Sequence, residues 1–203
     1  MRRGRPITLS DEDLLEAAQS VFLERGLGAT TSEVARRAKI SESVIFHRYK
    51  TKEALFLAIL ERQMNLAPEL EGLGTLVGQG DVAEHLNSVG MVLIAKMRAI
   101  RPFFMLAFSS PTKMRMLQER VRRVHPMYVR LLADYLEAEA RAGRLRGVDA
   151  QIMAHTFLGG VREYLFVELF PGSRKSVLPA ATRYVRGMVD ILLRGATTRD
   201  RQP

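Results

Sequence analysis

Apolar residues recur at intervals of three and four along almost the whole chain, and no segment shows sustained alternation between apolar and polar positions. The first spacing gathers apolar side chains on one face of an α-helix, whereas a half-buried strand requires the alternation. The pattern therefore predicts an all-α protein of about nine helices. These helices are expected at residues 10–25, 30–39, 42–49, 52–64, 82–100, 102–110, 112–142, 149–169 and 177–194.

Capping residues mark several of the helix boundaries. Ser10 precedes an acidic first turn, Thr30 and Glu33 have the spacing of a capping box, and Ser41 can cap the short helix that follows it. Pro126 predicts a kink or a junction between two helices within residues 112–142. The glycine-rich stretch EGLGTLVGQGD is expected to be a link, because the Gly-Lys-Ser/Thr of a phosphate-binding loop does not follow it.

Residues 31–49 have the layout of a helix-turn-helix: a helix, a tight turn and a short second helix. The second helix of such a motif must expose polar and small side chains to a major groove about 12 Å wide while its other face stays in a core. A plain amphipathic helix pair would share part of this pattern. The expected core residues are Val34, Ala35, Ala38, Ile40, Ile45 and Tyr49, and the expected outward residues are Glu42, Ser43, Val44, His47 and Arg48.

The segment ATTSEVARRAKISESVIFHRYKTKEALF resembles the DNA-binding signature of the TetR family of bacterial transcriptional regulators. The resemblance covers residues 10–62, and beyond them it rests on the order and lengths of the helices. The chain departs from the family at Lys39 and Ser43, where glycine is frequent. It also departs at Phe46, where the family usually has a tyrosine whose hydroxyl reaches a phosphate. Arg48, at a position where histidine is common, could replace that contact.

The resemblance implies a set of DNA-contacting residues. Thr30, Thr31 and Lys52 would bind phosphates at helix N-termini. Glu42 could accept a hydrogen bond from cytosine, or it could simply stabilise the positive end of its helix. The remaining residues that would face bases or nearby phosphates are Ser43, Val44, Phe46, His47 and Arg48.

A basic N-terminal arm precedes the first helix. Arg2, Arg3 and Arg5 fit a narrow minor groove, where arginine is favoured, although a loosely bound tail would have the same composition. The net charge of +9 is consistent with a polyanionic partner. Residues 1–65 nevertheless contain 11 basic and 9 acidic side chains, so most of the excess lies outside the expected DNA-binding segment.

The last two expected helices are apolar on more than one face, so one stripe can cover the subunit's core while the other needs a partner. The resemblance implies a homodimer formed through these helices. A two-fold axis would in turn require a roughly palindromic DNA operator. The expected interface residues are Gly160, Tyr164, Ala181, Tyr184, Val185, Met188, Val189 and Leu192.

Residues 91–127 are rich in methionine and phenylalanine, which suits either plain core packing or an adaptable apolar cavity. The resemblance implies a small-molecule effector in this region. Because the region has few carboxylates, we expect a neutral or acidic apolar effector. The expected lining residues are Met91, Met97, Phe103, Phe104, Met127, Tyr128 and Phe157.

Other function classes have little support in the sequence. The chain has no cysteine, its four histidines lack metal-ligand spacing, and it contains no Gly-x-Ser-x-Gly. We therefore expect no enzyme activity, no metal and no cofactor, and a cytoplasmic protein without a signal peptide or membrane span.

We expect a ligand-responsive dimeric repressor of double-stranded DNA; the alternatives are an activator and an architectural DNA-binding protein without an effector. The expected division is an arm at 1–9, a DNA-binding domain at 10–62, a ligand-binding and dimerisation domain at 63–196, and a flexible tail at 197–203.

Overall fold

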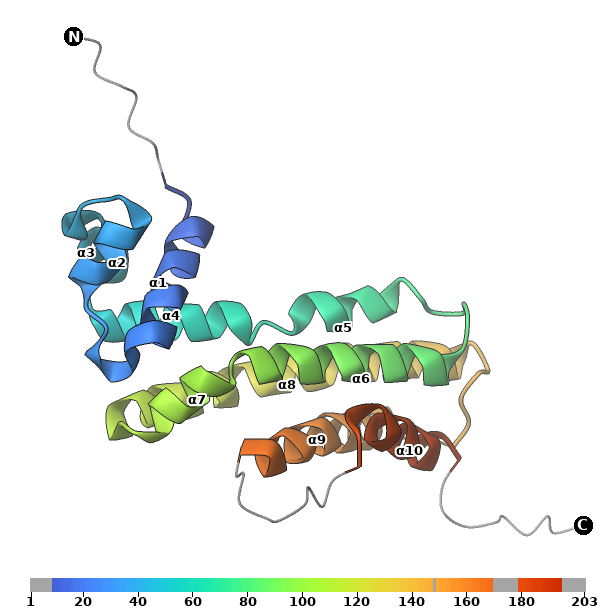
Figure 1. The fold of residues 1–203 in the computed structure, drawn as a ribbon. Coiled ribbons are helices and arrows are strands. Elements are labelled where there is room, and N and C mark those ends of the chain that lie inside the picture. Colours follow the sequence, from blue (N-terminus) through green and yellow to red (C-terminus); the bar gives the residue numbers. More distant parts are fainter. Residues whose placement is uncertain (1–8, 148, 170–178, 195–203) are drawn as a thin grey trace, which may run out of the picture. The chain divides into compact units, whose positions relative to one another are not determined.

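The computed structural model describes residues 9–147, 149–169 and 179–194. These residues form ten α-helices and a short 3-10 turn at Gly26–Gly28, and they contain no strand (Figure 1). The predicted all-α fold is confirmed. The described helices group into two compact units that are discontinuous in sequence.

The first unit comprises residues up to 64 together with residues 100–120. Its helices are α1 (Asp11–Arg25), α2 (Thr31–Ala38), α3 (Glu42–Tyr49), α4 (Lys52–Gln63), α7 (Arg101–Phe108) and the beginning of α8 (Pro111–Arg141). Helix α1 packs against α2 and α4, and α3 packs against α2 and α4.

The predicted caps of the first unit are largely present. The Ser10 hydroxyl accepts a hydrogen bond from the Asp13 N–H at 3.0 Å, and Thr30 with Glu33 forms a complete capping box. Ser41 occupies the N-cap position of α3, but its hydroxyl pairs with that of Ser43 at 2.7 Å instead of capping the helix. The sequence therefore predicted the caps of α1 and α2 correctly. At α3 it predicted the N-cap position correctly but not the hydrogen bond of the Ser41 hydroxyl.

Residues 100–120 belong to the first unit, although we expected them in a C-terminal domain beginning at residue 63. Phe103 of α7 is completely buried, and its ring centroid lies 5.8 Å from that of Phe56 on α4. Phe56 in turn lies 5.5 Å from Phe22 on α1, and the Lys113 ammonium lies 5.7 Å from the centroid of the Phe56 ring. Helix α7 therefore completes an aromatic core that α1 and α4 begin.

The second unit comprises residues 65–99 and the chain from Val121 onward. It contains α5 (Ala67–Gly74), α6 (Val82–Ala99), the rest of α8, α9 (Ala150–Leu169) and α10 (Ala181–Arg194). Helix α6 packs against α5, α9 and α10, and α9 also packs against α10. Their apolar faces, with that of α8, bury one hydrophobic core around Leu93, Leu132 and Phe157.

Two local predictions for the second unit need correction. Residues 71–74, expected in a link, end the short helix α5, whose first turn contains Pro68. Of the two outcomes predicted at Pro126, a junction between two helices is wrong, because α8 continues through it from Pro111 to Arg141. The first residues of the last expected helix, 177 and 178, and the expected tail at 197–203 lie outside the described residues.

Candidate nucleic-acid interface

Helices α2 and α3 form a helix-turn-helix whose inner face is buried. Val34, Ala35 and Ile45 are almost fully excluded from solvent, while Ala38, Ile40 and Tyr49 are half-buried. Helix α2 ends at Ala38, with Lys39 as its C-cap. The Ile40 N–H donates back to the Ala35 carbonyl at 3.0 Å, which turns the chain sharply before α3. The residues predicted to form the core of the motif therefore hold the two helices together.

The outer face of α3 exposes Ser43, Phe46 and His47, while Glu42, Val44 and Arg48 are partly covered. Phe46 has 43% of its surface exposed, which is unusual for a large apolar side chain in a folded unit. An exposed short helix with small, aromatic and imidazole side chains has the chemistry that major-groove contact requires.

Glu42 is engaged by Thr31, which was predicted to bind phosphate. The Thr31 side chain is buried, and its hydroxyl donates to Glu42 Oε1 across the two helices. The two side chains thus satisfy each other within the protein. Thr30, in contrast, is exposed at the N-terminus of α2.

Two further predicted contact residues are anchored within the first unit. Arg48 places Nη1 2.8 Å from Asp11 Oδ1 and donates from Nη2 to the Leu9 carbonyl at 2.8 Å. Lys52 donates to the Ala29 carbonyl at 3.0 Å. Both cations therefore stabilise the positions of α3 and α4 in the free protein. The predicted arm residues Arg2, Arg3 and Arg5 lie outside the described residues.

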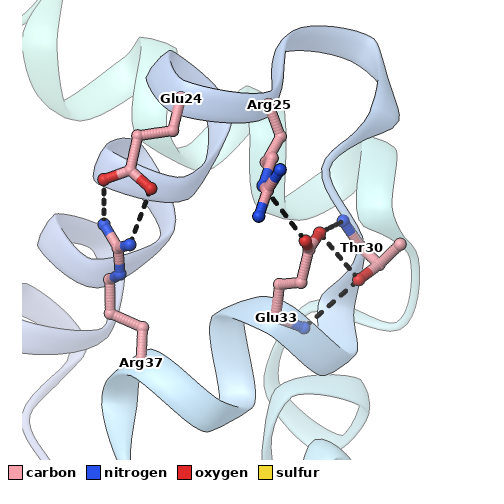
Figure 2. Close-up of polar contacts among 5 residues, drawn as sticks. All are labelled: Glu24, Arg25, Thr30, Glu33 and Arg37. Carbon is pink, nitrogen blue, oxygen red and sulfur yellow. Dashed lines mark hydrogen bonds and ion pairs between the residues drawn. The ribbon is translucent and has the colours of Figure 1, made fainter.

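A set of ion pairs holds α2 against α1 (Figure 2). The Arg37 guanidinium makes two bonds to the Glu24 carboxylate, at 2.5 and 2.7 Å, and Arg25 Nε lies 3.3 Å from Glu33 Oε1. The hydrogen bond from Arg37 lowers the pKa of Glu24, and hydrogen bonds from the Thr30 backbone and hydroxyl lower the pKa of Glu33. These carboxylates are therefore ionised at neutral pH. The sequence spacing revealed the Thr30–Glu33 box but not the Glu24–Arg37 pair, which depends on how α1 meets α2.

Two family models match the chain. Residues 14–59 match the bacterial regulatory proteins of the TetR family, and residues 91–195, more than half of the chain, match the C-terminal domain of AefR-like transcriptional repressors. The chain belongs to the TetR family. It is therefore a DNA-binding transcriptional regulator of the helix-turn-helix type and not an enzyme.

Individual relatives agree with this assignment. The chain is 24% identical over 173 residues to the HTH-type transcriptional regulator YvkB of Bacillus subtilis, covering 84% of this chain and 88% of YvkB. A TetR-family regulator from Mesorhizobium loti has a similar fold, with a TM-score of 0.73, 19% identity, and coverage of 90% of this chain and 94% of that one. FadR from Bacillus subtilis in complex with stearoyl-CoA gives a TM-score of 0.60 at 16% identity, with 93% and 100% covered.

The effector-lining residues expected in this TetR-family regulator are divided between the two compact units. Phe103 and Phe104 belong to the first unit, whereas Met91, Met97, Met127, Tyr128 and Phe157 belong to the second. Tyr128 and Phe157 are buried in the core of that unit, and the Tyr128 hydroxyl accepts a hydrogen bond from the Leu66 N–H at 3.3 Å. Met127 is largely exposed. The sequence could not show which of these residues belong to which unit, because methionine and phenylalanine occur in the cores of both.

The residues expected at the dimer interface lie on α9 and α10, but several of them face the chain's own core. Ala181, Val185 and Val189 are buried within the second unit. The Tyr184 hydroxyl donates to the Gly160 carbonyl at 3.1 Å, and the Tyr164 and Tyr184 rings lie 4.8 Å apart. Met188 and Leu192 are half-buried.

The large apolar side chains that α9 and α10 expose are Ile152, Phe166 and Ile191, with 64%, 51% and 63% of their surfaces accessible. The expected interface set omitted all three. Their spacing alone could not distinguish a stripe facing solvent from one facing the core.

His125 and His155 form a pair of rings with centroids 5.6 Å apart. Burial, and then the charge of Arg162 and the neighbouring His155, lower the pKa of His125, so its imidazole is neutral at neutral pH. Within the described ranges, no three or more histidine and carboxylate side chains are grouped to hold a metal ion, and no helix is long and apolar enough to cross a membrane.

Proposed function

We propose that this TetR-family regulator binds a palindromic operator as a homodimer, represses transcription from it, and is released by an apolar effector of neutral or acidic character. The exposed face of α3 carries this proposal. Ser43, Phe46 and His47 point away from the core that Val34 and Ile45 anchor, so they are available to base edges.

The exposed apolar residues of α9 and α10 support the homodimer. Ile152, Phe166 and Ile191 would remain in water in a monomer, whereas a second copy would remove them from it. A closed dimer of this kind has two-fold symmetry and presents two α3 helices to two half-sites. The match of residues 91–195 to the C-terminal domain of AefR-like repressors supports repression as the outcome.

The proposed apolar character of the effector rests on the side chains of the second unit. Met91 and Met97 pack partly buried against the core of the second unit, where flexible thioethers can rearrange around an apolar guest. Stearoyl-CoA, which FadR from Bacillus subtilis binds, joins an apolar chain to an acidic head group and is therefore a suitable first probe.

Selection from a randomised duplex pool with the purified protein at physiological salt tests the proposal. Enrichment of a palindrome is the expected result, whereas binding without enrichment would favour an architectural protein. Stearoyl-CoA is then added to the complex with the selected operator, with coenzyme A lacking the acyl chain as the control. Transcription in vitro from a promoter that carries the operator separates repression from activation.

A further inference from the structure

Two lysines flank the DNA-reading helix α3 in backbone conformations that lysine rarely adopts. Lys39, before α3, has φ 55°, and Lys50, immediately after it, has φ 58°. Among the described residues, they are the only non-glycine residues with positive φ. Such conformations are costly for side chains with a Cβ, and where they persist they often mark a functional constraint.

At Lys39 the strain follows from the turn between α2 and α3. Its φ and ψ of 55° and 40° are left-handed, and the Ile40 N–H reaches back five residues to the Ala35 carbonyl. Glycine is the usual residue at this position of a helix C-terminus, because it has no Cβ to crowd the following carbonyl. The turn would therefore form more readily with glycine than with lysine.

At Lys50 the strain is of a different kind. The Thr51 N–H donates to the Tyr49 carbonyl at 2.6 Å across Lys50, whose φ and ψ are 58° and −40°. This arrangement approaches the γ-turn of positive φ, the rarer and more strained of the two γ-turn forms. Lysine has no conformational advantage at either end of α3.

The two ammonium groups are available for an external partner. Both lysines are exposed, and their side chains make no hydrogen bond or ion pair with any described residue. Neighbouring cations differ in this respect, since Arg48 bonds to Asp11 and Leu9, and Lys52 to Ala29. Arg48 and Lys52, both expected from sequence to contact DNA, therefore bond within the protein, whereas the side chains of Lys39 and Lys50 do not.

The two lysines lie on opposite sides of α3 along the chain. Lys50 directly follows the helix, and Lys39 precedes it by the turn residues Ile40 and Ser41. When α3 lies in a major groove about 12 Å wide, long side chains that flank the helix can reach the phosphates that border the groove.

We propose that Lys39 and Lys50 are phosphate contacts that hold α3 in the major groove, and that the protein keeps lysine at both strained positions for its charge. The proposal rests on operator binding by α3 and adds two residues to it. It requires each lysine to lower the stability of the free protein while raising its affinity for DNA.

Two substitutions, Lys39→Gly and Lys50→Gly, test whether each lysine lowers the stability of the free protein while raising its affinity for DNA. Each substitution relieves the strain, so the melting temperature should rise by about 2–4 °C. Each also removes an ammonium group that would bind a phosphate, so the slope of log affinity against log salt should become shallower by about 0.9 in each variant. At physiological salt this change of slope corresponds to about a fivefold weaker affinity for each lysine replaced.

Two control variants isolate the cause. Lys39→Arg keeps the charge and the strain, so it should retain both the melting temperature and the salt dependence of the parent protein. Arg141→Gln removes an exposed charge at the end of α8 and should leave the salt slope almost unchanged. An unchanged slope in both glycine variants would overturn the phosphate role, and a lower melting temperature would overturn the strain argument.

The slope is measured on the selected operator and on an unselected duplex of the same length. Phosphate contacts contribute on both. A shallower slope on the unselected duplex would therefore support the lysine contacts even if selection enriched no palindrome and the proposed operator failed.

Discussion

Gly90 shows how one missing side chain sets the packing of the second unit. It lies on α6, where a Cβ would fall 2.7 Å from Val185 Cγ1 on α10 and 3.2 Å from Phe157 Cζ on α9. Both neighbours are almost fully buried and have little room to move. The close approach of three helices therefore depends on glycine at this position.

Gly90→Ala should lower the free energy of unfolding by about 1–2 kcal/mol. Alanine is the better helix former by about 1 kcal/mol, but overpacking a filled core costs about 1–3 kcal/mol and here outweighs that gain. Urea unfolding followed by circular dichroism measures the change. Gly72→Ala on α5, where no atom lies within 4 Å of the added Cβ, should instead stabilise the protein by about 0.5–1 kcal/mol. Equal gains in both variants would contradict the packing argument.

At the scale of elements, the hydrogen bond from Thr31 to Glu42 joins the first turns of α2 and α3. Because Glu42 bonds within the protein, we expect its primary role to be fixing the angle of the motif and not reading a base. This role differs from both roles considered from the sequence, a hydrogen bond to cytosine and stabilisation of the positive end of the helix.

Thr31→Val should lower the free energy of unfolding by about 1 kcal/mol, because it removes one hydrogen bond and leaves the shape unchanged. Glu42→Ala, which removes the acceptor, should show coupling of similar size when the two changes are combined in a double-mutant cycle. Ser32→Ala, at the exposed neighbouring position, is the matched control. If Thr31→Val and Glu42→Ala were additive, and Glu42→Ala alone changed the selected operator sequence, Glu42 would be a base contact.

Most helices could be predicted from the sequence because their capping and periodicity are local. Ser10, Thr30 and Glu33 identify the starts of α1 and α2 through interactions within four residues. Helix α5 was not predicted, because its two glycines lower the helix propensity of this short segment. The sequence could not place Phe103 in the first unit, because nothing local reveals that its partner is Phe56.

At the scale of the whole molecule, α9 and α10 must meet two demands: covering their own core and, in the proposed homodimer, meeting a second copy. Val185 and Val189 serve the first demand, since they are buried in the isolated chain. Ile152, Phe166 and Ile191 remain exposed and are suited to the second. Sequence spacing detected two apolar stripes on α10 but could not say which of them the chain itself covers.

Ile191→Glu should give a folded monomer with weakened operator binding, because a charge would be buried in the dimer but exposed in the free chain. Light scattering after gel filtration measures the mass, and circular dichroism measures the folded fraction. Val185→Glu should instead unfold the second unit. Arg186→Gln, at an exposed polar position on α10, should remain dimeric. A dimer that persists in Ile191→Glu would place the interface elsewhere.

The chain passes between its two compact units three times, after residues 64, 99 and 120. Consider a hybrid regulator in which the DNA-binding head of this protein is joined to a foreign sensing domain at one junction near residue 64. Such a hybrid would lack residues 100–120, which belong to the first unit. Phe56 would then be without Phe103, and the end of α1 would be without Leu106, whose Cδ2 lies 3.6 Å from the Cβ position at Gly26. Transplanting the operator preference of this protein therefore requires two separate inserts, moved together.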